Sequence, residues 1–155
     1  MSMNESHGLS GRLHVAIRDA TDGGRLVGER RVDNLITDPG RQLLARLFAG
    51  QAQLAELRIV AGSNGDSQGA DVATLTPVAD ARASVQVAEA VSDHRATARV
   101  TATLPATGDA RPQSIQEAGI LLVLAERQVV YNRVTFPVIS RAGNLELTFT
   151  WDVSF

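Results

Sequence analysis

The stretch LELTFTWDVSF, residues 145–155, decides the fold class. Apolar residues occupy every second position in it: Leu145, Leu147, Phe149, Trp151, Val153 and Phe155. Successive side chains of a β-strand point to opposite faces of the sheet, so a period of two predicts a strand with one buried and one solvated face. We therefore expect a half-buried strand here, with Phe155 facing the core.

Two pairs of segments upstream share this alternation. In RATARVTATL, residues 95–104, small or branched apolar residues alternate with arginine and threonine, and ARASVQVAEAV, residues 81–91, begins in the same way. In residues 81–91 the alternation shifts by one position near Ala88, which predicts a β-bulge. The short link SDHR predicts an antiparallel hairpin between the two segments. Residues 11–20 and 25–32 form another predicted hairpin, because the intervening TDGG contains Asp-Gly, which favours a tight turn.

A third hairpin is predicted from AGILLVLA, residues 118–125, and QVVYNRVTF, residues 128–136, with its turn at Glu126-Arg127. The run ILLVL is apolar on both faces of a strand. Such a strand lies either in the centre of a sandwich or in a contact with another protein. Leu121 and Val123 are for this reason candidate interface residues.

The segment VVYNRVTFPVIS, residues 129–140, carries polar residues inside a predicted strand. We interpret Tyr131, Asn132 and Arg133 as architecture rather than chemistry: they are candidate interface residues, and Asn132 and Arg133 are also candidates for pinning a turn. An Arg133→Ala variant is accordingly expected to lose assembly and keep its fold. Pro137 cannot donate to a β-ladder, so we expect it at a strand end, a bulge or a sheet edge.

One segment, residues 38–49, has a helical pattern. Asp38 is a suitable cap, Pro39 suits the first helical position, and Gly50 suits the end of a helix. An apolar stripe is expected to cover an open end or face of the sheets; it consists of Leu43, Leu44, Leu47 and Phe48. With about eight strands, the chain is predicted to be an all-β antiparallel β-sandwich with this one short helix. Residues 1–155 are expected to form a single domain whose residues 1–10 are a flexible N-terminal tail.

The composition excludes several kinds of chemistry. The chain has 155 residues, 44% of them hydrophobic, and a net charge of −2, so no global charge attracts nucleic acid or an anionic membrane. All 15 basic residues are arginine, which rules out a Schiff-base or phosphate-loop lysine. The chain has no cysteine and therefore no thiolate site. Its first residues lack the pattern of a secretory signal, so we expect a soluble protein made in the cytoplasm.

One loop has the residue types of a metal site. Residues 62–80 form a long expected connection, and within it residues 64–71 are rich in oxygen ligands for calcium. The loop lacks the EF-hand spacing, and its residue types are also those of ordinary turns. The histidines His7, His14 and His94 do not pair at a metal-ligand spacing.

Catalysis finds no support in the pattern of acidic residues. The carboxylates considered for a glycosidase pair are candidates by type alone: Glu117, Glu126, Glu146 and Asp152. Aromatic residues are 4% of the chain, which is few for a sugar-binding or base-stacking surface. We therefore expect no enzyme activity, no cofactor, no metal and no small-molecule substrate.

Several segments resemble small β-structured proteins and domains of bacteriophage tails and of phage-derived contractile injection systems. Residues 34–50, NLITDPGRQLLARLFAG, resemble the family's strand, capped turn and Leu-rich helix. Residues 57–65, LRIVAGSNG, resemble its next strand with a Gly-rich turn, followed by the Thr-Pro loop of residues 73–77. Residues 115–155 resemble its close, with an N-R-x-x-F-P segment beginning at Asn132 and a final W-x-x-x-F strand.

This resemblance implies a non-catalytic structural subunit of a phage or phage-like particle: a tail, baseplate, fibre-attachment or decoration protein. Its partners would be other copies of itself and other particle proteins, with no nucleic acid and no membrane, and its location would be the virion or particle assembled in the bacterial cytoplasm. The alternative is a free-standing β-sandwich that binds a ligand, either a carbohydrate or a calcium-dependent one. In that case calcium should raise the melting temperature, and Asp66→Ala or Asp71→Ala should abolish the shift.

Overall fold

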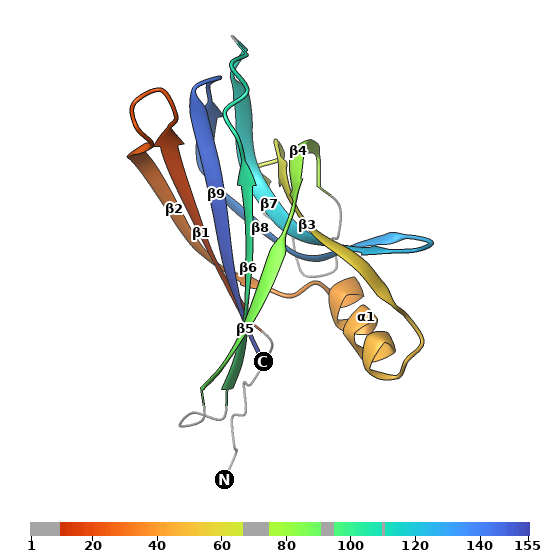
Figure 1. Ribbon diagram of the computed structural model, residues 1–155. Coiled ribbons are helices and arrows are strands. Elements are labelled where there is room, and N and C mark those ends of the chain that lie inside the picture. The colour runs from red at the N-terminus through yellow and green to blue at the C-terminus, as the bar shows by residue number, and fades with distance from the viewer. Residues whose placement is uncertain (1–9, 67–74, 91–94, 110) are drawn as a thin grey trace.

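The computed structural model describes residues 10–66, 75–90, 95–109 and 111–155, and these ranges form an all-β sandwich with one helix (Figure 1). The first four strands are β1 (Ser10–Asp19), β2 (Arg25–Leu35), β3 (Leu54–Gly62) and β4 (Pro77–Arg82). The others are β5 (Ser84–Ala90), β6 (Arg95–Leu104), β7 (Gln113–Leu124), β8 (Gln128–Arg141) and β9 (Leu145–Ser154). A five-stranded antiparallel sheet in the order β2-β1-β9-β6-β5 packs on a four-stranded one in the order β4-β3-β7-β8. The predicted sandwich is therefore confirmed.

The alternating stretch that predicts the fold forms β9, the central strand of the larger sheet. It pairs with β1 on one side and with β6 on the other. Leu147, Phe149 and Trp151 are fully buried, so the predicted inner face is correct. Phe155 differs, because it follows the end of β9 and 55% of its surface is exposed.

A strand missing from the prediction explains why the described chain has nine strands instead of about eight. Residues 77–80, expected in a long loop, belong to β4, which pairs with β3. At Ala83 the chain passes directly into β5 of the other sheet, and the Ala83 N–H donates to the Leu57 carbonyl over 2.9 Å. The consecutive strands β4 and β5, both green in Figure 1, thus join the two sheets along one side.

The bulge expected near Ala88 is absent from the β5–β6 pairing. The register is continuous across β5, and Ala88 pairs with Thr97. Ala88 lies on the same exposed face as Ser84 and Gln86. Alanine is tolerated on an exposed face, so its place among these polar residues does not require a bulge. The hairpin itself is confirmed, as are the β1–β2 and β7–β8 hairpins.

The other side of the sandwich is held by polar contacts between β2 and β8. Arg30 Nε donates to the Pro137 carbonyl over 3.1 Å, and its Nη2 donates to the Val138 carbonyl over 3.2 Å. β8 is the edge strand of its sheet, and its register with β7 shifts between Ile115 and Glu117, opposite Pro137. Pro137 therefore lies at an edge and at an irregularity, as expected, and β8 continues beyond it to Arg141.

The helix α1 (Asp38–Phe48) begins one residue away from the predicted cap. Thr37, not Asp38, is the N-cap: its Oγ1 accepts the Gly40 N–H over 3.0 Å and donates to the Val130 carbonyl over 2.6 Å. The Thr37 hydroxyl therefore both caps the helix and fastens it to β8. The helix ends before Gly50, whose φ of 72° is the left-handed conformation that favours glycine.

Replacing Gly40 with alanine is expected to destabilise the protein by about 1–3 kcal/mol, because the added methyl group overpacks the contact between helix and strand. A Cβ at Gly40 would lie 2.5 Å from the Tyr131 carbonyl oxygen and 2.9 Å from its Cα. Urea unfolding followed by circular dichroism measures the effect. The neighbouring exposed Arg41→Ala is the control and should change stability by less than about 0.5 kcal/mol. Equal stability of the two variants would show that α1 docks elsewhere.

The apolar stripe of α1 covers the core with three of its four residues. Leu43 is buried, and Leu44 and Leu47 are partly buried against the core. Phe48 was expected in the stripe, yet it is 97% exposed. No helix in the described ranges has the length and apolar character to cross a membrane. The expected tail, residues 1–10, lies outside the described residues except for Ser10, the first residue of β1.

Candidate functional site

Two charged side chains with little exposed surface meet on the four-stranded sheet, between β7 and β8. Arg133 Nη2 lies 2.8 Å from Glu117 Oε2, and the two side chains are 5% and 0% exposed. Glu117 pairs with Thr135 and Gly119 pairs with Arg133, so the two charged residues are diagonal neighbours across the hairpin. A buried pair of this kind requires further hydrogen bonds to compensate for lost water.

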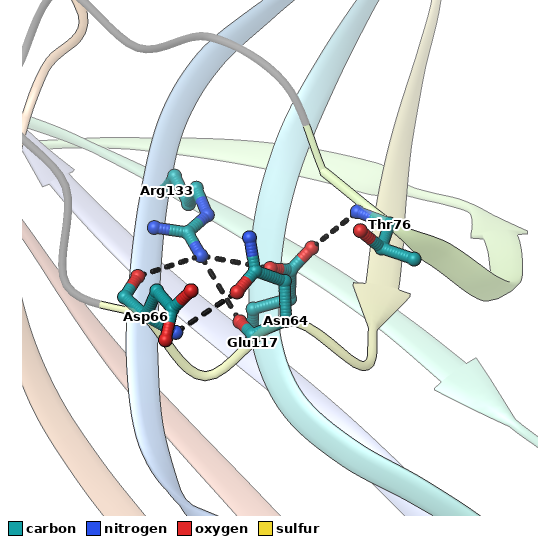
Figure 2. Close-up of polar contacts among 5 residues, drawn as sticks. All are labelled: Asn64, Asp66, Thr76, Glu117 and Arg133. Atoms are coloured by element: carbon teal, nitrogen blue, oxygen red, sulfur yellow. Dashed lines mark hydrogen bonds and ion pairs between the residues drawn. The ribbon is translucent and has the colours of Figure 1, made fainter.

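Those further bonds come from the connection between β3 and β4 (Figure 2). Arg133 Nη2 also donates to the Asn64 and Asp66 carbonyls, each over 3.0 Å. Glu117 Oε1 accepts the Thr76 N–H over 2.6 Å. Asn64 and Asp66 precede residues 67–74, and Thr76 follows them, so one ion pair holds both ends of this connection. We call these five residues the loop clamp.

Glycines let the connection approach the clamp closely. A Cβ at Gly62 would collide with Glu117 Oε1 and lie 2.6 Å from the Thr76 carbonyl. The Asn64 side chain accepts the Asp66 N–H over 2.9 Å, which shapes the turn that faces Arg133. The Gly-rich turn quoted for the family resemblance is thus the turn that the clamp holds.

A β-bulge next to the clamp positions the helix. Ile120 pairs with Asn132, and Leu121 pairs with Val130, so Tyr131 is the additional residue on β8. The Asn132 side-chain oxygen accepts the Ile120 N–H over 2.9 Å. The Tyr131 carbonyl accepts the Thr37 N–H over 2.9 Å, immediately before α1. The bulge therefore turns backbone groups of β8 toward the start of the helix.

The structure separates the predicted interface residues into two groups. Tyr131 and Asn132 are buried, and the side chain of Arg133 is 5% exposed and bonds atoms of its own chain. Leu121 and Val123 are partly exposed on the central strand β7, and for them the interface remains a prediction. The prediction that Arg133 pins a turn is confirmed by its bonds to Asn64 and Asp66. Its burial changes the expectation for Arg133→Ala, which should now destabilise the fold itself.

Burial raises the pKa of the Tyr131 hydroxyl to about 12, an effect that the charge of Arg41 reduces. The Oη has no hydrogen-bond partner within the described residues. Burial favours the neutral phenol of Tyr131 in the folded state, and this preference contributes to the stability of the fold. The contribution is complete below the unfolded pKa of about 10 and is lost as the pH rises through 12.

We therefore expect this tyrosine, the only one in the chain, to titrate near pH 12 in the folded protein. Ultraviolet absorbance of the phenolate measures the titration, with circular dichroism recorded in parallel. The urea-unfolded chain is the control and should titrate near 10. A folded-state titration near 10 would mean that water reaches the ring.

The remaining candidates for chemistry do not come together. His14 lies 3.3 Å from Glu29, and Asp152 pairs with Arg99 over 2.8 Å, both on exposed surface. Within the ranges that the structure describes, no three His, Asp or Glu side chains form a group that could hold a metal. His7, Asp71 and His94 lie outside the described residues. The Asn64 and Asp66 carbonyls of the proposed calcium loop are bonded to Arg133 instead.

Comparison of the chain with protein-family models, with curated proteins and with solved structures finds no match.

Proposed function

We propose that the protein is a non-catalytic structural subunit of a phage or phage-like particle and acts by assembling with copies of itself and with other particle proteins. In this proposal it is a tail, baseplate, fibre-attachment or decoration protein located in the particle. The observation that carries the proposal is the outer face of the four-stranded sheet, where the loop clamp and an apolar strip lie side by side.

This outer face follows from alternation along β7. Glu117, Gly119, Leu121 and Val123 are successive residues of one face. The loop clamp covers the first part of that face, and Leu121 and Val123 form the second part, where they pair with Arg58 and Glu56 of β3. Loop ends that are bonded to the sheet, next to apolar side chains, form a surface suited to a permanent protein contact.

The residues that carry the family resemblance support the same proposal, because their roles are architectural. The Asn132 side chain accepts a hydrogen bond at the bulge, and Arg133 forms the ion pair of the loop clamp. Pro137 lies at the sheet edge where Arg30 contacts β8. A motif whose polar side chains bond their own backbone favours a structural function over a catalytic one.

Light scattering of the purified protein together with electron microscopy of particles from the source cells tests the proposal. We expect a mass above that of one chain and a location in a tail-like or shell-like particle. A protein that is monomeric at all concentrations and absent from every particle would overturn it.

A further inference from the structure

An apolar cleft opens between α1 and the neighbouring strands. Its volume is about 190 Å³, and every side chain that lines it is aliphatic or aromatic. Leu44 and Leu47 contribute from α1, Leu54 from β3, Val85 from β5 and Val153 from β9. Burial of such surface is favourable, so an open cleft of this composition is a site for apolar groups.

Exposed apolar side chains border this cleft. On the inner face of the larger sheet, Val87 pairs with Ala98, which pairs with Val153, and the latter two line the cleft. Val87 lies at the free edge of this row and is 69% exposed, and Phe155 is 55% exposed. The inner face of the sheet therefore continues past the cover that the second sheet provides.

Phe48 is about one helical turn away from a residue that lines this cleft. It is four residues after Leu44 on α1, and residues with this spacing are neighbours on one helix face. Leu44 lines the cleft, whereas Phe48 is 97% exposed. An almost fully exposed phenylalanine at an apolar opening is the feature expected of a contact residue.

The exposed apolar surface around the cleft has the size of a protein contact. From their exposed fractions, the side chains of Phe48, Leu54, Val85, Val87 and Phe155 offer together roughly 450 Å². A stable interface covers about 800 Å² on each partner, of which about 60% is apolar. The surface around the cleft thus supplies the apolar part of one such interface. We call Phe48, Leu54, Val85, Val87 and Phe155 the cleft rim.

We propose that the cleft rim is the contact with a second copy of this chain, in which Phe48 of each copy enters the cleft of the other. The inference rests on the proposed function, since it names one surface of the assembly. A cavity of about 150 Å³ is sufficient for a benzene ring, so the cleft accommodates the ring of Phe48. Phe48 and the cleft lie on the same surface of the chain. Each copy therefore inserts its Phe48 into the cleft of the other, and the contact closes as a two-fold dimer.

Sedimentation velocity over a concentration series tests the contact. The wild type should dimerise, and Phe48→Ser should raise the dimer dissociation constant by about 30-fold or more, as for a central aromatic contact. The matched control is Val138→Ser, which changes an exposed apolar residue on β8 and should leave the constant unchanged. Because Phe48 is 97% exposed, Phe48→Ser and the wild type should have the same melting temperature when both are monomeric.

Cross-linking locates the contact independently, because the chain has no cysteine of its own. Mixing single variants Phe48→Cys and Val85→Cys under oxidation should join the two different chains by a disulfide. Mixing Val138→Cys with Val85→Cys should give no such product. A wild-type dimer without the first cross-link overturns the inference.

The outcomes separate this inference from the proposed function. If the wild type assembles and Phe48→Ser assembles equally well, the cleft contact is wrong and assembly through another surface stands. If the wild type stays monomeric and is absent from particles, both fail. A monomeric protein that retains a small apolar molecule in native mass spectrometry also overturns the second copy as the occupant.

Discussion

Replacing Glu117 with alanine is expected to destabilise the protein by about 3–5 kcal/mol, the usual cost of removing one partner from a buried ion pair. The change leaves the Arg133 guanidinium buried without its carboxylate and the Thr76 N–H without its acceptor. In a chain of this size the melting temperature should fall by roughly 6–20 °C. Calorimetry and urea unfolding of the purified variant measure the loss.

Two control variants identify the cause of this effect. Asp152→Ala removes an Arg–Asp pair with the same shortest distance, 2.8 Å, from exposed surface and should cost less than about 1 kcal/mol. Glu117→Leu combined with Arg133→Met removes both charges and should be much less destabilising than Glu117→Ala alone. A loss for Glu117→Ala no larger than that for Asp152→Ala would contradict the buried pair.

The loop clamp also predicts where the destabilised variant changes first. One end of the connection between β3 and β4 is bonded to Glu117 through Thr76, and the other end is bonded to Arg133, which pairs with Glu117. Hydrogen exchange should therefore increase at Thr76 and Asp66 before it increases in β9, because regions open with different local free energies. Equal increases across both sheets would indicate global unfolding instead.

Alternation predicts most of the sandwich, because a half-buried strand requires it. The stretch around Trp151 and the hairpins of residues 11–32 and 81–104 follow this rule and were predictable from it. β4 was not, because PVADAR begins with proline and lacks a clear period, and its strand conformation comes from pairing with β3. The true cap of α1, Thr37, is followed by Asp38, and aspartate has the higher intrinsic preference for that position.

The candidate site was less predictable than the fold. The sequence predicts that Arg133 pins a turn, whereas it presents the partner Glu117 only as a carboxylate candidate for catalysis. Their pairing depends on the register of β7 and β8 and on the return of residues 63–66 across the sheet, and neither has a local sequence signal. Helical spacing predicts that Phe48 belongs to the apolar stripe of α1, because spacing shows which residues share a face. Tertiary packing decides how far that face is covered.

Replacing Trp151 with alanine should cost about 3–5 kcal/mol as well, through a cavity in the core instead of an unpaired charge. Trp151 is the largest fully buried side chain of the described residues, and its cross-strand partners are Leu13 and Val100. Strands on both sides hold β9 in place, so the surrounding backbone has little freedom to fill the space. Urea unfolding followed by far-ultraviolet circular dichroism measures the loss without relying on tryptophan fluorescence.

Two further substitutions on β9 make this prediction specific to the inner face. Trp151→Phe keeps an aromatic ring and leaves a smaller cavity, so its cost should be clearly below that of Trp151→Ala. Thr150→Ala changes the adjacent residue, whose side chain points to the outer face, and should cost only about 0.5 kcal/mol. If Thr150→Ala were as damaging as Trp151→Ala, the buried and solvated faces of β9 would be reversed, because a shift of one residue exchanges the two faces.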